Sequence, residues 1–252
     1  MRELSIDPVL ELRDLTGPAV DPVVHGVDIV VGRGETRLLL GPIHSGKSTV
    51  MRLILGLDRA AQGTIIVDGE SFDAAGMPDD DLRRLRTRVG VVFEGSALVT
   101  RISAEENVEL PLLEHTAASA RAARDTAREL LDEVGLTAGT LVTPEELGRA
   151  ERRRVALARA LALNPPVLLL DEPTHGLDPH AAAQFDETIA RLQGEHGFGA
   201  LVFSHEVRHA FGRIAHIYVM DDGAIVADGS RAELEHSAQP VVRQLFHRRG
   251  PS

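Results

Sequence analysis

The chain contains one lysine among its 27 basic residues, and this lysine lies in a sequence pattern that can bind phosphate. The pattern is G-x-x-x-x-G-K-[ST], and the residues that fit it are Gly41, Pro42, Ile43, His44, Ser45, Gly46, Lys47, Ser48 and Thr49. Its glycines let backbone N–H groups turn toward phosphate oxygens, and the compact ammonium of Lys47 fits between the β- and γ-phosphates, where a guanidinium fits poorly. Ser48 offers a hydroxyl to Mg²⁺. The pattern therefore predicts a site for a nucleoside triphosphate and magnesium.

A second apolar run ends in two acidic residues that can reach the same ligand. Residues 167–170 read VLLL and are followed by Asp171 and Glu172. Because the carboxyl ends of parallel strands share one edge of a sheet, we expect these acids to lie beside the phosphate loop. Asp171 would then hold Mg²⁺ through water, and Glu172 would orient or deprotonate the water that attacks the phosphate. Lys47 and Glu172 are thus candidate catalytic residues for hydrolysis.

Hydropathy patterns indicate the elements that must hold these groups in place. Residues 36–40 (TRLLL) predict a short buried parallel strand directly before the loop, and residues 48–57 carry apolar side chains at helical spacing after it. Residues 96–164 contain little strand pattern. Three helices are predicted there: one begins at a capping box over Ser103–Glu106, the second spans residues 121–134 and the third spans residues 149–163. We interpret the arginine run 152–154 on the last helix as a solvated face.

The composition is that of an acidic globular protein. The chain has 252 residues and a formal net charge of −11, which argues against a main task of binding nucleic acid or anionic lipid. It has no cysteine, which excludes disulfides, thiolate catalysis and cysteine-ligated zinc. No apolar run approaches the ~18–20 residues that a membrane-spanning helix needs, and the first residues are too charged for a signal peptide. We therefore expect a soluble, cytoplasmic protein.

With these motifs in place, the sequence resembles the ATP-binding-cassette (ABC) ATPases over nearly its whole length. Residues 174–179 (THGLDP) look like the D-loop of that family, with Asp178 at the acidic position, and residues 203–206 (FSHE) look like its switch region. The resemblance implies that ATP is the nucleotide, that His205 contacts its γ-phosphate as a catalytic residue, and that Asp178 takes part in nucleotide binding.

The resemblance also implies an architecture. The expected fold class is α/β: a P-loop NTPase core of the ABC ATPase type, with an N-terminal antiparallel β element and an inserted helical subdomain. Within a single domain, residues 1–252, the parts would be a nucleotide-binding core (1–95 and 165–235), a helical subdomain (96–164) and a C-terminal tail (236–252). Residues 239–252 leave two interpretations open: a frayed polar tail, or a short helix that latches the dimer or a permease.

Three positions depart from the family's pattern. The glutamine of its Q-loop is Glu94 here; a carboxylate can still coordinate Mg²⁺, but its charge should weaken ATP binding or change its Mg²⁺ dependence. The signature Leu-Ser-Gly-Gly-Gln is replaced by residues 147–151 (LGRAE). In ABC dimers this loop closes on the partner's γ-phosphate, so Gly148 and Arg149 are predicted to contact nucleotide; Arg149 would either compensate as a cation or block closure. Residues 15–20 (LTGPAV) lack the aromatic that usually stacks on adenine.

Three segments are similar to the ATPases of Mce/Mla-type lipid transporters: residues 95–100 (GSALVT), 106–115 (ENVELPLLEH) and 240–246 (PVVRQLF). Residues 106–113 are nearly as close to lipoprotein-release and macrolide-export ATPases. The resemblance implies a homodimer, or a heterodimer with another ABC ATPase, that couples MgATP hydrolysis to a separate membrane permease for a lipid or another hydrophobic substrate. From the altered signature we expect this hydrolysis to be slow in a homodimer and faster beside a subunit with an intact signature. Such a subunit lies on the inner face of the cell membrane and meets it only through the permease. The alternative is a nucleotide-binding regulatory or assembly subunit with impaired hydrolysis.

Overall fold

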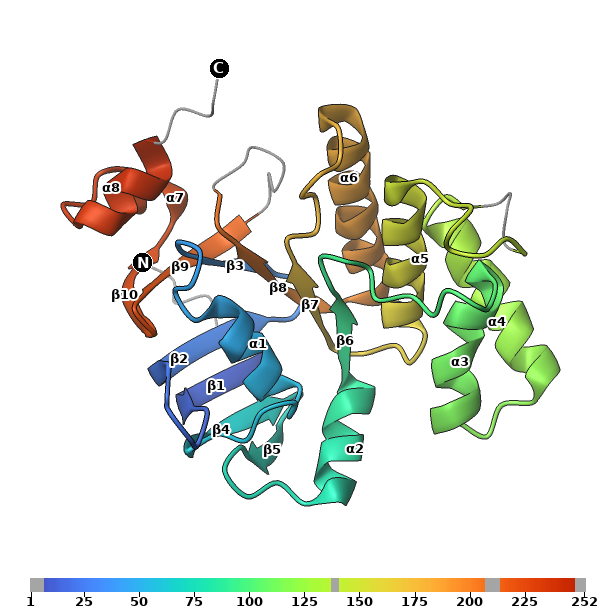
Figure 1. Cartoon of the computed structure of the whole chain (residues 1–252), viewed down its shortest axis with the longest axis horizontal. Coiled ribbons are helices and arrows are strands. Elements are labelled where there is room, and N and C mark those ends of the chain that lie inside the picture. The colour runs from blue at the N-terminus through green and yellow to red at the C-terminus, as the bar shows by residue number, and fades with distance from the viewer. Residues whose placement is uncertain (1–6, 137–140, 207–213, 248–252) are drawn as a thin grey trace.

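The molecule contains two β-sheets, one mainly parallel and one antiparallel (Figure 1). The structure, a computed structural model, describes residues 7–136, 141–206 and 214–247. Within those ranges, no helix is both long and apolar enough to cross a membrane.

The larger sheet has, among the described residues, six strands in the order β10-β9-β3-β8-β7-β6. The strands are β3 (Thr36–Leu40), β6 (Val89–Val92), β7 (Val167–Asp171), β8 (Gly199–Ser204), β9 (Ile214–Asp221) and β10 (Ala224–Gly229). β10 pairs antiparallel with β9, and the other pairings are parallel. Because both faces of the sheet are covered, β3, β7 and β8 are continuous buried runs rather than alternating ones. Their carboxyl ends meet at one edge.

The smaller sheet confirms the antiparallel element expected near the N-terminus. Its strands, in the order β2-β1-β4-β5 within the described chain, are β1 (Pro8–Gly17), β2 (Val24–Gly32), β4 (Gln62–Val67) and β5 (Glu70–Asp73). Helix α1 (Lys47–Ile54) follows β3, and its Val50 and Met51 share one buried cluster with Leu39 of β3 and Val9 of β1. The helix ends three residues before the predicted residue 57, because the chain turns at Gly56 with φ 58°.

The described chain between β6 and β7 is helical, as the sequence predicted. Its helices are α3 (Ala104–His115), α4 (Ala120–Glu133) and α5 (Arg149–Leu161); α2 (Asp79–Arg88) precedes β6, and α6 (Pro179–His196) follows β7. The predicted capping box is present: the Glu106 N–H donates to Ser103 Oγ at 3.1 Å, and the Ser103 N–H donates to Glu106 Oε2 at 2.7 Å. Gly135, with φ 77°, follows the end of α4.

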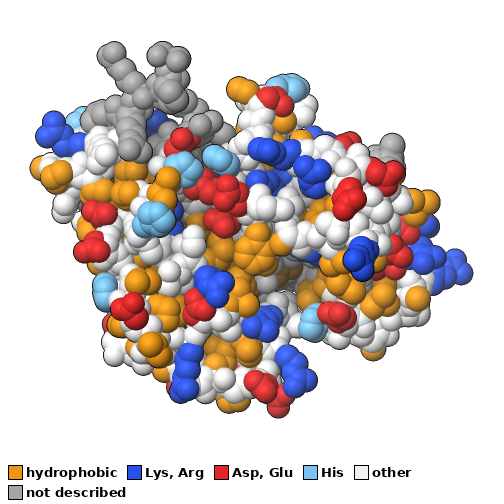
Figure 2. Space-filling view, in the orientation of Figure 1, with side chains coloured by type: hydrophobic (Ala, Val, Ile, Leu, Met, Phe, Trp, Pro, Cys, Tyr) orange, Lys and Arg blue, Asp and Glu red, His pale blue; other side chains and the backbone are white. Residues whose placement is uncertain are grey.

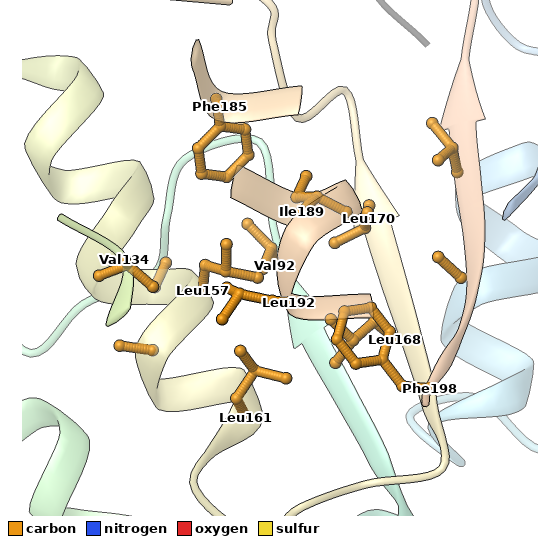
Figure 3. Close-up of a cluster of buried hydrophobic side chains, with 14 of the residues drawn as sticks. Val92, Val134, Leu157, Leu161, Leu168, Leu170, Phe185, Ile189, Leu192 and Phe198 are labelled. Carbon is orange, nitrogen blue, oxygen red and sulfur yellow. The ribbon is translucent and has the colours of Figure 1, made fainter. Parts of the chain in front are cut away.

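These helices and the larger sheet share one apolar core. Figure 3 shows Leu157 and Leu161 of α5 close to Ile189 and Leu192 of α6 and to Leu168 of β7. All five side chains are at most 4% exposed. Because these side chains are closely packed, a displacement of α5 would also shift β7, the strand that ends in Asp171.

The interpretation of the arginine run on α5 as a solvated face is wrong for its middle residue. Arg153 is only 1% exposed, and its Nη1 donates to Phe93 O, just beyond β6, at 2.8 Å. Arg154 is partly buried and donates to Gly135 O at 3.2 Å. These two hydrogen bonds connect α5 to the segments that follow β6 and α4.

The C-terminal segment folds back on its own chain. It contains α7 (Arg231–Glu235) and α8 (Pro240–His247), and Val242 and Leu245 of α8 are buried in the same core as the larger sheet. The frayed-tail interpretation is therefore wrong for residues 240–247. Residues 248–252 lie outside the described residues, and a role of this helix as a latch stays a prediction.

Candidate nucleotide-binding site

The predicted phosphate loop joins β3 to α1, and its shape depends on glycine. Gly46 has φ 104° and places no side-chain cap on α1, so the N-terminus of this helix is suited to an anion. A Cβ on Gly41 would overlap Met220 O. His44 adopts φ 69° with an exposed side chain, a conformation that costs energy in a residue with a Cβ. The loop is thus a tightly curled backbone beside a helix N-terminus.

Lys47 is the first residue of α1 and is only 9% exposed. Its ammonium donates to Gly41 O at 2.8 Å and to Pro42 O at 2.7 Å. Burial lowers the pKa of Lys47, and the charges of Glu172 and Asp171 oppose that shift. A buried ammonium whose hydrogen-bond partners are neutral oxygens is suited to receive an anionic phosphate.

Asp171 lies where negative charge accumulates. Burial, followed by the charges of Glu172 and Glu94, raises the pKa of Asp171 to about 6. A divalent cation would relieve this repulsion. Within the described ranges, however, no three histidine or carboxylate side chains converge closely enough to hold a metal by themselves. A cation would therefore need phosphate oxygens and the exposed Ser48 hydroxyl as further ligands, an all-oxygen set that fits Mg²⁺.

Glu172 and His205, predicted separately, form a close pair. The backbone N–H of His205 donates to Glu172 Oε1 at 2.8 Å, and His205 Nδ1 lies 2.5 Å from the same oxygen. The Ser204 hydroxyl donates to Glu172 Oε2 at 2.9 Å. Glu172 itself has φ 42°, a left-handed conformation that is rare for a residue with a Cβ and often marks a functional site. Its carboxylate is thus held in one orientation at the end of β7.

His175 joins this group, although the sequence did not single it out. Its Nε2 lies 3.8 Å from Glu94 Oε1, and its ring centre lies 5.8 Å from that of His205. Figure 2 shows histidine side chains beside acidic ones on this face of the molecule, with basic side chains next to them. The signal in the sequence was the histidine within THGLDP, but the spacing alone did not say which groups it would meet.

Arg153 is a second residue whose place the sequence did not reveal. Burial lowers the pKa of Arg153, and the charges of Glu94 and Asp171 oppose that shift. Its Nε is enclosed and has no hydrogen-bond partner among the residues that the structure describes. A buried guanidinium thus supplies positive charge close to the carboxylates at the end of β7.

The predicted signature loop lies at the N-terminus of α5. The Gly148 N–H donates to Glu151 Oε2 at 2.7 Å, and Arg149 Nη1 donates to Gly176 O of the same chain at 3.1 Å. Asp178 caps α6 by accepting two backbone N–H bonds at 3.0 Å, which lower its pKa. The predicted roles of Gly148, Arg149 and Asp178 in nucleotide binding concern a dimer and stay predictions.

Aliphatic side chains occupy the region where the sequence lacks an adenine-stacking aromatic. Val20 is 86% exposed and Val23 is 46% exposed. Val23 O lies 3.3 Å from the position that a Cβ on Gly46 would take, so this segment flanks the phosphate loop. A base bound here would meet branched aliphatic groups rather than an aromatic plane.

Comparison with known proteins places this geometry in a family. Residues 24–175 match the family model described as ABC transporter. The lipoprotein-releasing system ATP-binding protein LolD of Anaeromyxobacter dehalogenans is 41% identical over 238 residues, which cover 91% of this chain and 97% of LolD. The intermembrane phospholipid transport system ATP-binding protein MlaF of Escherichia coli K12 is 33% identical, with coverage of 97% and 90%. The methionine import ATP-binding protein MetN of Caulobacter vibrioides is 38% identical, with coverage of 89% and 67%.

Solved structures agree with the sequence matches. The dimeric ATP-binding cassette MJ0796 bound to ADP and Pi superposes with a TM-score of 0.77 at 30% identity, covering 88% of this chain and 98% of MJ0796. The chain therefore belongs to the ABC transporter family, as one of its ATP-binding subunits.

Proposed function

We propose that this chain hydrolyses MgATP slowly and couples that hydrolysis to a separate membrane permease that moves a lipid or another hydrophobic substrate. The observation that carries the hydrolytic part is the Glu172–His205 pair, whose carboxylate and imidazole lie 2.5 Å apart. Glu172 is close enough to the buried Lys47 for its charge to affect the pKa of that lysine. A catalytic carboxylate and a phosphate-binding ammonium thus belong to one site.

The predicted residues of the chain's own phosphate and magnesium site each have a task in this proposal. Residues 41–49 hold the phosphates, with Lys47 as the cation, while Ser48, Asp171 and Glu94 hold magnesium. Magnesium, when bound, neutralises charge on the phosphate oxygens. Oε1 of Glu172 is occupied by His205, whereas Oε2 accepts from Ser204 and keeps a second lone pair, which can accept a proton from water. His205 contacts the γ-phosphate and is held in place by Glu172.

A groove between the helical region and β6 supports the permease part of the proposal. It has a volume of about 250 Å³ and is bounded by residues of α2, β6, α3 and α5. Leu110, Pro111 and Val91 give it apolar walls, and Glu114 and Arg159 add charge to its lining. Such a groove suits a short amphipathic helix from a partner. Its α3 wall is formed by Leu110, Pro111, Glu114 and His115, which belong to residues 106–115, the segment that resembles lipid-transporter ATPases.

The substrate class rests on two of the relatives. LolD and MlaF are named for lipoprotein release and phospholipid transport, whereas MetN is named for methionine import. LolD and MlaF are also matched over at least nine-tenths of their own length. We therefore favour a lipid or lipidated substrate.

Steady-state phosphate release by the purified chain tests the hydrolytic part. We expect Glu172→Gln to lower the rate about 10²-fold, because a general base typically contributes that much or more. The matched control is Glu187→Gln, a change of an exposed carboxylate on α6, which should leave the rate unchanged. Equal rates for the unmodified chain and Glu172→Gln would contradict intrinsic hydrolysis and favour the regulatory or assembly role.

A further inference from the structure

Arg149 lies in an unfavourable place for a cation. It is the first residue of α5, at the helix end where the backbone dipole favours negative charge. The helix also has a suitable acid there already, because Glu151 accepts the Gly148 N–H at 2.7 Å. The exposed side chain of Arg149 is not held by burial. Its conformation must therefore be explained by a specific contact.

That contact is the carbonyl of Gly176, in the turn between β7 and α6. Arg149 Nη1 donates to Gly176 O at 3.1 Å. Gly176 has φ 72°, and a Cβ at this position would overlap Arg149 Nη1. The guanidinium therefore lies against the bare Cα of a residue whose backbone conformation also favours glycine.

The turn that Arg149 contacts also carries His175. Backbone bonds close the turn on itself: the His175 N–H donates to Glu172 O at 3.0 Å, and the Leu177 N–H donates to Thr174 O at 3.1 Å. Outside the turn, the His175 side chain lies near Glu94 and His205. Arg149 thus contacts the turn that follows Glu172, and the His175 side chain of this turn lies near Glu94 and His205.

We propose that Arg149 is a positioning residue, which fastens residues 174–178 to α5 of its own chain and so keeps His175 between Glu94 and His205. The inference deepens the proposed ATPase function, because the site it acts on is the Glu172–His205 site of the same chain. In this arrangement the guanidinium acts through the loop and is not a phosphate ligand of a second subunit.

Amide hydrogen exchange of the nucleotide-free chain, followed by mass spectrometry, tests the contact without requiring hydrolysis. We expect Arg149→Ala to speed exchange in residues 174–178 by about 3- to 10-fold, the effect of losing one net hydrogen bond. Arg149→Lys should have a smaller effect, because an ammonium can still donate to the carbonyl. The matched control is Arg154→Ala, which removes bonds from the same helix to another glycine carbonyl, Gly135 O, and to Gln184 Oε1 of α6. It should leave exchange in residues 174–178 unchanged.

Kinetics then separate positioning from phosphate binding. Arg149→Ala should lower kcat while KM for MgATP stays within about twofold, since bound phosphate is held by residues 41–49, and Arg149→Lys should recover part of kcat. Unchanged exchange in Arg149→Ala, with weaker MgATP-dependent dimerisation, would overturn the inference and make Arg149 a ligand across the dimer. Absence of phosphate release by the unmodified chain would contradict the proposed function alone, because the exchange result does not depend on it.

Discussion

Lys47 and Arg153 show that a side chain's surroundings, not its charge alone, decide its role. Lys47 is buried beside backbone carbonyls, in a pattern that identified it in the sequence. Arg153 was assigned to solvent because it lies in a charged run, yet it precedes the fully buried Leu157 by one helical turn. Helical spacing thus indicates that Arg153 lies on the inner face of α5. The carbonyl of Phe93, which accepts the hydrogen bond from its guanidinium, could not be predicted from the sequence.

The exchange of Lys47 for arginine tests whether charge alone suffices in the phosphate loop. We expect Lys47→Arg to weaken MgATP binding at least about 10-fold, because a planar guanidinium cannot replace a compact ammonium between Gly41 O and Pro42 O. Isothermal titration calorimetry would measure the affinity. The reverse exchange, Arg52→Lys, on an exposed face of α1 should leave it unchanged. Equal affinity for Lys47→Arg would show that the loop requires only a positive charge.

The pairing of Glu172 with His205 marks the limit of sequence reasoning at the site. Glu172 was predicted from its position after an apolar strand, and His205 from the resemblance of residues 203–206 to the family's switch region. Their contact depends on the register of β7 against β8, in which Asp171 is paired with Phe203. No local sequence pattern specifies that register. No local pattern specifies that His175 lies near Glu94 either.

At the scale of elements, the presence of a helix or strand was easier to predict from the sequence than the residue at which it ends. The strand before the phosphate loop and the helices of residues 96–164 follow from hydrophobic spacing and a capping box, which are local signals. α1 and α5 nevertheless end earlier than predicted, at Ile54 and Leu161. Apolar residues continue beyond both ends, so hydropathy alone did not mark the last turn.

Helix α6 contains a carboxylate that its surroundings do not satisfy. Both oxygens of Asp186 are enclosed and have no hydrogen-bond partner among the described residues, and burial raises the pKa of Asp186 to about 7. The folded protein therefore keeps a proton that the unfolded chain releases near pH ~4. The stability contributed by this proton is complete below pH ~4 and is lost as pH rises to about 7.

We expect Asp186→Asn to remove this loss. Above pH ~7 the variant should be more stable to urea than the unmodified chain by about 1–3 kcal/mol, and near pH ~4 the difference should be smallest or reversed. Glu187→Gln, at the neighbouring exposed position, serves as the control and should show no such trend. A stability difference that does not change with pH would mean that Asp186 is ionised in the folded protein throughout this range.

At the scale of the whole molecule, the continuous core links the groove to the catalytic edge. Leu157 of α5 and Leu168 and Leu170 of β7 belong to one buried cluster, which also includes Val108 and Leu112 of α3. α3 forms a wall of the groove, and β7 ends in Asp171. A partner bound in the groove would thus contact α3, which packs in the same core as β7, the strand that positions Asp171.

Leu110 provides a test of this coupling. In proteoliposomes containing the partner permease, Leu110→Glu should abolish the stimulation of phosphate release, because an apolar contact would then bury an unpaired carboxylate. Basal release should stay within about twofold. Leu113→Glu, at a half-exposed position of α3 outside the groove lining, should keep the stimulation. Intact stimulation in Leu110→Glu would place the permease contact elsewhere.

The burial of Lys47 also determines how the molecule reacts with chemical probes. Because Lys47 is the only lysine and is enclosed by the phosphate loop, the folded surface offers no side-chain amine to acylating reagents or amine-directed cross-linkers. Carboxylate-directed chemistry is therefore better suited than amine-directed chemistry to map the assembly by cross-linking, because the chain has 38 acidic residues. An acylating nucleotide analogue, by contrast, has one side-chain target, so protection of a single amine would report the occupancy of the nucleotide site.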